Sequence, residues 1–112
     1  MKAQVMQFKW TESRGRNTSG WNICSLYIDG KKVARQCGGG YDMQGAAFGE
    51  YLTEHYQDRL TVENAGGFKP HKGKIYLDGA CGFSSMERIA AGIGLTVEYK
   101  SEGLYIITDT KE

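Results

Sequence analysis

The sequence predicts an α+β fold, in which an antiparallel sheet of about five or six strands carries two helices packed on one face. Several segments alternate polar and apolar residues with the period of two that half-buried strands show. Two other segments repeat apolar residues at helical spacing. Alternating strands indicate an antiparallel sheet with one covered face. In order, we expect a strand (4–10), a hairpin (21–37), a helix (42–59), a strand (74–79), a helix (82–94) and a hairpin (95–109).

The composition is that of an ordinary globular chain and sets the first limits on function. The 112 residues suffice for one domain, 1–112, whose core needs neither a metal nor disulfides. Lys and Arg total 14 and Asp and Glu 13, so the net charge is +1. A dedicated duplex-DNA binder usually has a more basic balance, which disfavours that class. The start lacks the apolar stretch of a signal peptide and no run could cross a membrane, so we expect a cytoplasmic protein without membrane contact.

The predicted hairpin at 21–37 turns at Asp29-Gly30, a dipeptide that tolerates the positive φ angles of a two-residue type I′ turn. With that turn, the numbers of facing residues sum to 59. One face is then expected to reach the core, while the other carries Trp21 and Tyr27 and faces solvent or a partner. A register slip of one residue would exchange the two faces. The expected core face comprises Cys24, Leu26, Ile28, Val33, Arg35 and Cys37.

Two segments have the period of helices. In the first, residues 42–59, Gly45 and Gly49 are four positions apart and form a smooth patch that another element could approach closely. In the second, Ser84 and Glu87 have the spacing of a capping box. The buried stripe of the first helix is expected to contain Phe48, Tyr51, Leu52, His55 and Arg59.

The glycine run Gly38-Gly39-Gly40 before the first helix has two interpretations. Free N–H groups and the positive end of a helix dipole suit a phosphate. The run matches neither the P-loop nor the dinucleotide-binding pattern, however. Asp42 at the helix N-cap would accept hydrogen bonds from the same donors and repel a phosphate. We therefore favour a glycine hinge followed by an Asp42 cap, with a ligand or partner loop as the alternative.

The sequence offers no clear catalytic group and no metal or cofactor site. His55 lies on the apolar stripe and is expected to be a partly buried ring, whereas His71 lies in a surface loop. Neither has a second histidine or a cysteine at metal-ligand spacing. Ser84 and Ser85 are explained as helix caps, and Cys81 has no identifiable base. We therefore predict a protein that is not an enzyme.

The segment "SRGRNTSGWNICSLYIDGKKVARQCGGGYDM" resembles small orphan proteins encoded by bacteriophages and prophages. In these, a strand-DG-strand hairpin leads into a "GGGYDM"-like loop and a helix. The resemblance covers residues 13 to about 52 and carries no established activity. Such proteins are often inhibitors of host defence, anti-CRISPR proteins among them, that bind a host effector without chemistry. The resemblance therefore implies a cytoplasmic location in a bacterial host.

These observations predict a non-enzymatic binding protein that blocks a host protein or ribonucleoprotein effector, such as a CRISPR effector. Tyrosine, tryptophan and arginine are the residue types that anchor interfaces. The alternative is a nucleic-acid or nucleotide-binding module that uses the Gly38–Gly40 loop and nearby basic residues. An exposed edge strand could also make a homodimer. The predicted contact residues are Trp21, Tyr27, Lys31, Lys32, Arg35, Tyr41 and Asp42.

Overall fold

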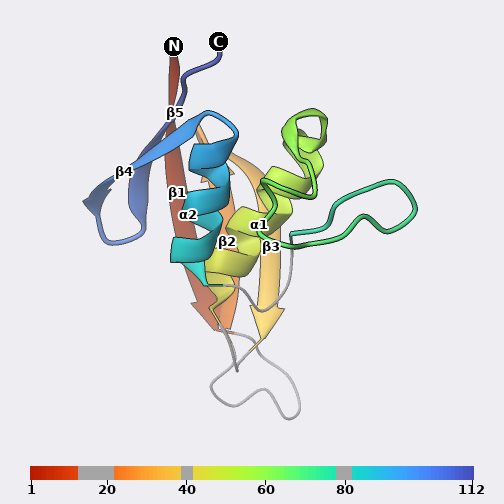
Figure 1. The fold of residues 1–112 in the computed structure, drawn as a ribbon. Coiled ribbons are helices and arrows are strands. Elements are labelled where there is room, and N and C mark those ends of the chain that lie inside the picture. The colour runs from red at the N-terminus through yellow and green to blue at the C-terminus, as the bar shows by residue number, and fades with distance from the viewer. Residues whose placement is uncertain (13–21, 39–41, 78–81) are drawn as a thin grey trace.

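The computed structural model describes residues 1–12, 22–38, 42–77 and 82–112, and in these it confirms the α+β prediction. Figure 1 shows the two helices, α1 and α2, lying in front of the sheet. The described residues form one five-stranded antiparallel sheet in the order β3-β2-β1-β5-β4. The elements are β1 (Lys2–Glu12), β2 (Asn22–Ile28), β3 (Lys31–Gly38), α1 (Met43–His55), the 3₁₀ turn η1 (Gln57–Arg59), α2 (Phe83–Gly92), β4 (Leu95–Ser101) and β5 (Leu104–Asp109).

The first strand holds the centre of the sheet, because β1 pairs with β2 along one side and with β5 along the other. Two hairpins, β2–β3 and β4–β5, are thereby joined through the N-terminal strand. Met6 and Phe8 point toward the helices and are buried, as their alternation predicted. Trp10, the next residue on this face of β1, is 43% exposed. On β1 the buried residues therefore end at Phe8, whereas the neighbouring Cys24 of β2, which faces Trp10, is still fully buried.

The β2–β3 hairpin turns at the predicted dipeptide, with φ of 51° at Asp29 and 83° at Gly30. Next to the turn the predicted register holds, since Tyr27 faces Lys32. A bulge then leaves Val33 without a facing residue, and Leu26 faces Ala34. An extra residue in one strand reverses its alternation beyond that point.

The predicted core face of β3 was consequently wrong beyond the bulge. Ala34 is buried, whereas Arg35 and Cys37 are exposed on the opposite face of the sheet. Cys24 faces Gln36 in place of Arg35, and Cys37 faces Ile23. The Asp29-Gly30 dipeptide predicted the position of the turn, but nothing in the alternation of polar and apolar residues predicted the bulge. Cys24, Leu26 and Ile28 on β2 are buried as predicted.

Helix α1 begins as predicted and ends a turn early. It runs from Met43 to His55, and the chain then makes the 3₁₀ turn η1. Arg59 therefore does not belong to the buried stripe of α1. The two terminal nitrogens of its guanidinium donate to the two oxygens of the Asp109 carboxylate, at 3.0 and 2.9 Å. One of these nitrogens also donates to the carbonyl of Ile93 at 3.2 Å. Arg59 thus joins η1 to the end of α2 and to β5.

The segment 75–77, which was predicted as part of a strand, does not join the sheet. It crosses α1, and side chains of α1 and η1 satisfy its backbone. Thr53 Oγ1 accepts from the N–H of Leu77 at 2.7 Å and donates to the carbonyl of Gly49 at 2.8 Å. The side-chain amide of Gln57 accepts from the N–H of Ile75 at 3.0 Å and donates to its carbonyl. These bonds replace the strand ladder that the segment lacks.

The close approach of this segment depends on Gly49, as the smooth patch predicted. A Cβ at this position would overlap the carbonyl of Leu77 and would lie 3.1 Å from the Met86 sulfur. Met86 belongs to α2, which packs against α1. The ring of Phe83 in α2 makes an edge contact with the ring of Phe8, at a centroid distance of 5.6 Å, and a tilted contact with that of Phe48, at 5.4 Å.

Among the described residues, neither helix combines the length and apolar character that a membrane crossing requires.

Replacing Gly49 by alanine is expected to destabilise the protein by about 1–3 kcal/mol, because the added methyl group meets backbone that cannot move aside. Gly92, near the end of α2, offers a matched control. Alanine there would meet only an ordinary contact, 3.9 Å from the Cβ of Asn64, and is expected to be neutral or to stabilise by up to about 1 kcal/mol. Urea unfolding of both variants measures the difference, and equal stabilities would contradict the packing argument.

The pairing of Asp109 with Arg59 predicts a specific loss of stability in acid. Hydrogen bonds from Arg59 hold the pKa of this carboxyl below its ordinary value. A depressed folded-state pKa stabilises the protein above the unfolded value of about 4, and this contribution disappears as the pH falls through the folded-state value. Asp109→Asn should therefore lower the free energy of unfolding at pH 7 and flatten its decline below about pH 5. The exposed Asp58→Asn variant is the control, and parallel pH profiles for Asp109→Asn and the wild type would contradict the prediction.

Candidate binding surface on the open face of the sheet

The face of the sheet that points away from α1 and α2 carries three of the predicted contact residues. Tyr27, Lys32 and Arg35 alternate with the buried residues of β2 and β3 and therefore share this face. Lys31 faces Ile28, on the side of the helices, and Asp42 caps α1. Trp21 and Tyr41 lie outside the described residues. We call the face that holds Tyr27 the open face.

Tyr27 is the centre of a small cationic group. The Lys9 ammonium lies 4.8 Å and the Lys32 ammonium 5.9 Å from the centroid of its half-buried ring. Both distances suit cation–π attraction. In the adjacent row of the sheet, Lys9 faces Ser25, which in turn faces Arg35. Three cations, one from β1 and two from β3, therefore lie on either side of Tyr27 of β2.

Lys9 was missed as a contact residue in the sequence. Its outward direction follows from the alternation of β1, but its place beside Tyr27 depends on how β1 and β2 align. No turn joins these strands within the described residues, so local sequence does not fix their register. The arrangement could be found only from the complete sheet.

The open face also has an apolar part beside the cations. Val5 is 41% exposed and faces Ile106 across β1 and β5, and Leu104 faces Gln7 in the next row. Ile23 is half-buried on β2. This combination of apolar side chains with a tyrosine and an arginine resembles the composition of protein interfaces.

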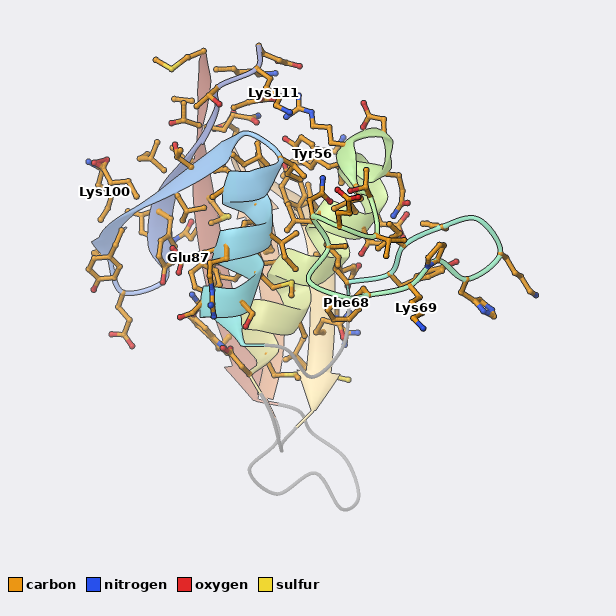
Figure 2. All side chains as sticks on the ribbon, viewed as in Figure 1. Tyr56, Phe68, Lys69, Glu87, Lys100 and Lys111 are labelled. Carbon is orange, nitrogen blue, oxygen red and sulfur yellow. The ribbon has the colours of Figure 1, made fainter. Side chains whose placement is uncertain are left out.

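Charge is distributed unequally along the open face. The described residues of β1, β2 and β3 place three cations there, Lys9, Lys32 and Arg35, and no carboxylate whose side chain is described. At the other edge of the sheet, Glu98 and Lys100 of β4 pair with each other at 2.9 Å. Figure 2 shows Lys100 on this hairpin, well away from the helices. The positive potential is therefore concentrated on the β1–β3 half.

Asp42 has a structural role that the sequence predicted only in part. Its Oδ1 accepts from the N–H of Gly45 at 3.0 Å, which confirms the N-cap of α1. Its Oδ2 accepts from the N–H of Phe83 at 2.8 Å, in the first turn of α2. The predicted capping box was wrong, because α2 has Gly82 as its N-cap and no side-chain cap bond of its own. The carboxylate of Asp42 thus accepts a hydrogen bond from the first turn of each helix.

This double cap bears on the phosphate interpretation of the glycine run. The helix dipole makes an N-terminus attractive to an anion. At α1 that anion is already the carboxylate of Asp42, held within the chain. Gly39 and Gly40 themselves lie outside the described residues. A phosphate at this point would have to displace Asp42.

The cysteines and histidines are placed as follows. Burial raises the pKa of Cys24 to about 12, so its thiol stays protonated at neutral pH. Cys37, which we expected to be buried, is exposed, and Cys81 lies outside the described residues.

His55, which we expected to be partly buried, is exposed, and the centroid of its ring lies 4.9 Å from that of Tyr51. The backbone of His71 forms an isolated antiparallel β-bridge with that of Lys74. Within the described ranges, no three His, Cys, Asp or Glu side chains are grouped to hold a metal ion.

Comparisons of this chain with protein-family models, with curated protein sequences and with solved structures gave no match.

Replacing Asp42 by alanine should destabilise the protein by about 1–3 kcal/mol, because two helix N-termini lose an acceptor. Asparagine should have a smaller effect, since it keeps an oxygen for one of the two N–H groups. Ser84→Ala is the matched control, because the exposed Ser84 caps nothing and its loss should change stability by less than about 0.5 kcal/mol. Chemical unfolding compares the three variants. A Ser84→Ala loss as large as that of Asp42→Ala would contradict the shared cap.

Proposed function

We propose that this protein is a non-enzymatic binding protein of phage or mobile-element type, which acts in the bacterial cytoplasm by blocking a host defence macromolecule. The observation that carries the proposal is the group of Lys9, Lys32 and Arg35 around Tyr27 on the open face. The phage origin and the defence target derive from the resemblance over residues 13–52. No catalytic step is part of the proposal.

The geometry of the open face supports a role in macromolecular binding. Both helices pack on the other face, so the side chains around Tyr27 are available to a partner. Aromatic and arginine side chains are the commonest interface anchors, and the apolar strip at Val5 and Ile106 extends the contact area. The cations favour a partner with an acidic surface, and a ribonucleoprotein effector such as a CRISPR effector offers one. Complementary charge would mainly increase the rate and specificity of association.

A second candidate function is direct binding of nucleic acid or a nucleotide. Tyr27 could stack on a base while Lys9, Lys32 and Arg35 contact phosphates. The version of this hypothesis that uses the Gly38–Gly40 loop has less support, because Asp42 occupies the N-terminus of α1. A homodimer through an edge strand, β3 or β4, is a further alternative.

Affinity capture from a bacterial lysate, with and without nuclease, tests the proposal. The wild type should retain a discrete protein or ribonucleoprotein partner after nuclease treatment. Tyr27→Ala and Arg35→Glu should each reduce its capture by at least about tenfold, as interface anchors do. Lys69→Glu makes the same charge change as Arg35→Glu on a loop that projects from the side of the molecule away from Lys100 (Figure 2), and it should capture as well as the wild type.

The outcomes separate the candidates. If only nucleic acid is retained, and binding weakens steeply with salt, the second candidate is correct. A partner that is captured equally by Tyr27→Ala, Arg35→Glu and Lys69→Glu would exclude the open face as the contact surface. Sedimentation of the purified protein distinguishes a homodimer.

A further inference from the structure

A cavity of about 440 Å³ lies between the β2–β3 turn and the last turns of α1. Its size falls within the range of small-molecule sites, roughly 300–1,000 Å³. Four elements of the fold contribute to its wall, so it is a feature of the packed structure and not of a single loop. The lining residues are Gln4, Ile28, Lys31, Lys32, Val33, Tyr51 and His55.

The cavity has an apolar interior and a basic rim. Ile28 and Tyr51 are buried and Val33 is half-buried, whereas Lys31 and His55 are exposed. Burial raises the pKa of Tyr51 well above its ordinary value, so its hydroxyl remains a neutral donor. That hydroxyl lies 3.4 Å from the hydroxyl of Tyr56. The wall therefore combines apolar surface with neutral and cationic polar groups.

The described acidic side chains of the β2–β3 turn and of α1 are already engaged. Asp29 accepts from the N–H of Val5 at 2.8 Å and from the Gln4 amide at 3.2 Å, and the first of these bonds chiefly lowers its pKa. On α1, Glu50 accepts from the Gln36 amide at 2.6 Å, and Glu54 pairs with Lys74 at 3.2 Å.

The cations of the rim are not balanced in the same way. Within the described part of the chain, no carboxylate lies at ion-pair distance from Lys31 or Lys32. Among the residues that the structure describes, no acidic side chain lines the cavity. An occupant with a negative charge at the rim and an apolar body would therefore complement both parts of the wall.

We propose that this cavity is a binding site for an amphipathic carboxylate, with the carboxylate at Lys31 and the apolar part against Ile28, Val33 and Tyr51. Two sources present this chemistry: a free small carboxylate, or the C-terminal carboxylate of a peptide that ends in an apolar residue. A carboxylate held by an ammonium group gains a charge-assisted hydrogen bond. The apolar part gains from leaving water. The proposed site does not include Tyr27, Lys9 or Arg35, and it shares only Lys32 with the cationic group of the open face.

Titrations followed by amide NMR test the site with three small probes. Hexanoate has both the charge and the tail, hexan-1-ol has only the tail, and acetate has only the charge. Hexanoate should shift the signals of Ile28, Val33 and Tyr51 in a saturable way. It should bind at least about tenfold more tightly than hexan-1-ol or acetate. Acetyl-Gly-Gly-Leu with a free C-terminus, compared with its amide, shows whether a peptide end can supply the carboxylate.

Lys31→Gln is the informative variant, because Lys31 is exposed and its replacement leaves the core unchanged. It should weaken hexanoate binding by roughly fivefold, as loss of one exposed charge-assisted bond would. Lys69→Gln, with the same charge change elsewhere, should leave the affinity unaltered. Binding of hexanoate alone identifies a free carboxylate, and binding of the acid peptide but not its amide identifies a chain end. Equal responses to hexanoate and hexan-1-ol, shifts outside the cavity, or unchanged binding in Lys31→Gln would overturn the proposal.

Discussion

The contact between Gly49 and Leu77 is the constraint on which the arrangement of the helices depends. Only a residue without a side chain lets the carbonyl of Leu77 lie directly on α1. The segment that crosses there would leave polar backbone buried, but Thr53 and Gln57 bind its N–H and carbonyl groups. The chain can then continue to α2, whose Met86 packs against the same glycine. Gly49, Thr53 and Gln57, which follow one another at intervals of four residues along α1 and η1, thus determine where the second helix lies.

Placing both helices together has a consequence for the sheet. Because α1 and α2 lie side by side on one face, their N-termini come close enough for Asp42 to bind both. The aromatic rings of Phe8, Phe48 and Phe83 fill the space between helices and sheet. The opposite face receives no helix from the described residues (Figure 1). It is left to display Tyr27 and its surrounding cations, so the packing of the core decides which surface is available for binding.

The parts of the structure that local chemistry determines were predictable from the sequence. The Asp29-Gly30 turn, the Asp42 cap and the buried alternation of β1 and β2 each depend on a few neighbouring residues. Features that depend on distant residues were not. Of the strand expected at 74–79, residues 78 and 79 lie outside the described residues, and residues 75–77 bind α1 and η1 because Thr53 and Gln57 offer hydrogen bonds at the required spacing. Of the candidate site, Tyr27 and the β3 cations were identified, whereas the place of Lys9 required the register of β1.

The bulge at Val33 connects this failure of prediction to the proposed function. Without it, Arg35 would point toward the helices and face the buried Cys24, where a guanidinium would lose its hydration. The extra residue turns Arg35 to the open face, in the row next to Tyr27 and Lys32. An edge strand tolerates such a bulge, and Glu50 of α1 accepts from the Arg35 N–H at 3.3 Å and from the Gln36 amide at 2.6 Å. The core helix therefore stabilises the irregularity that places the third cation of the open face.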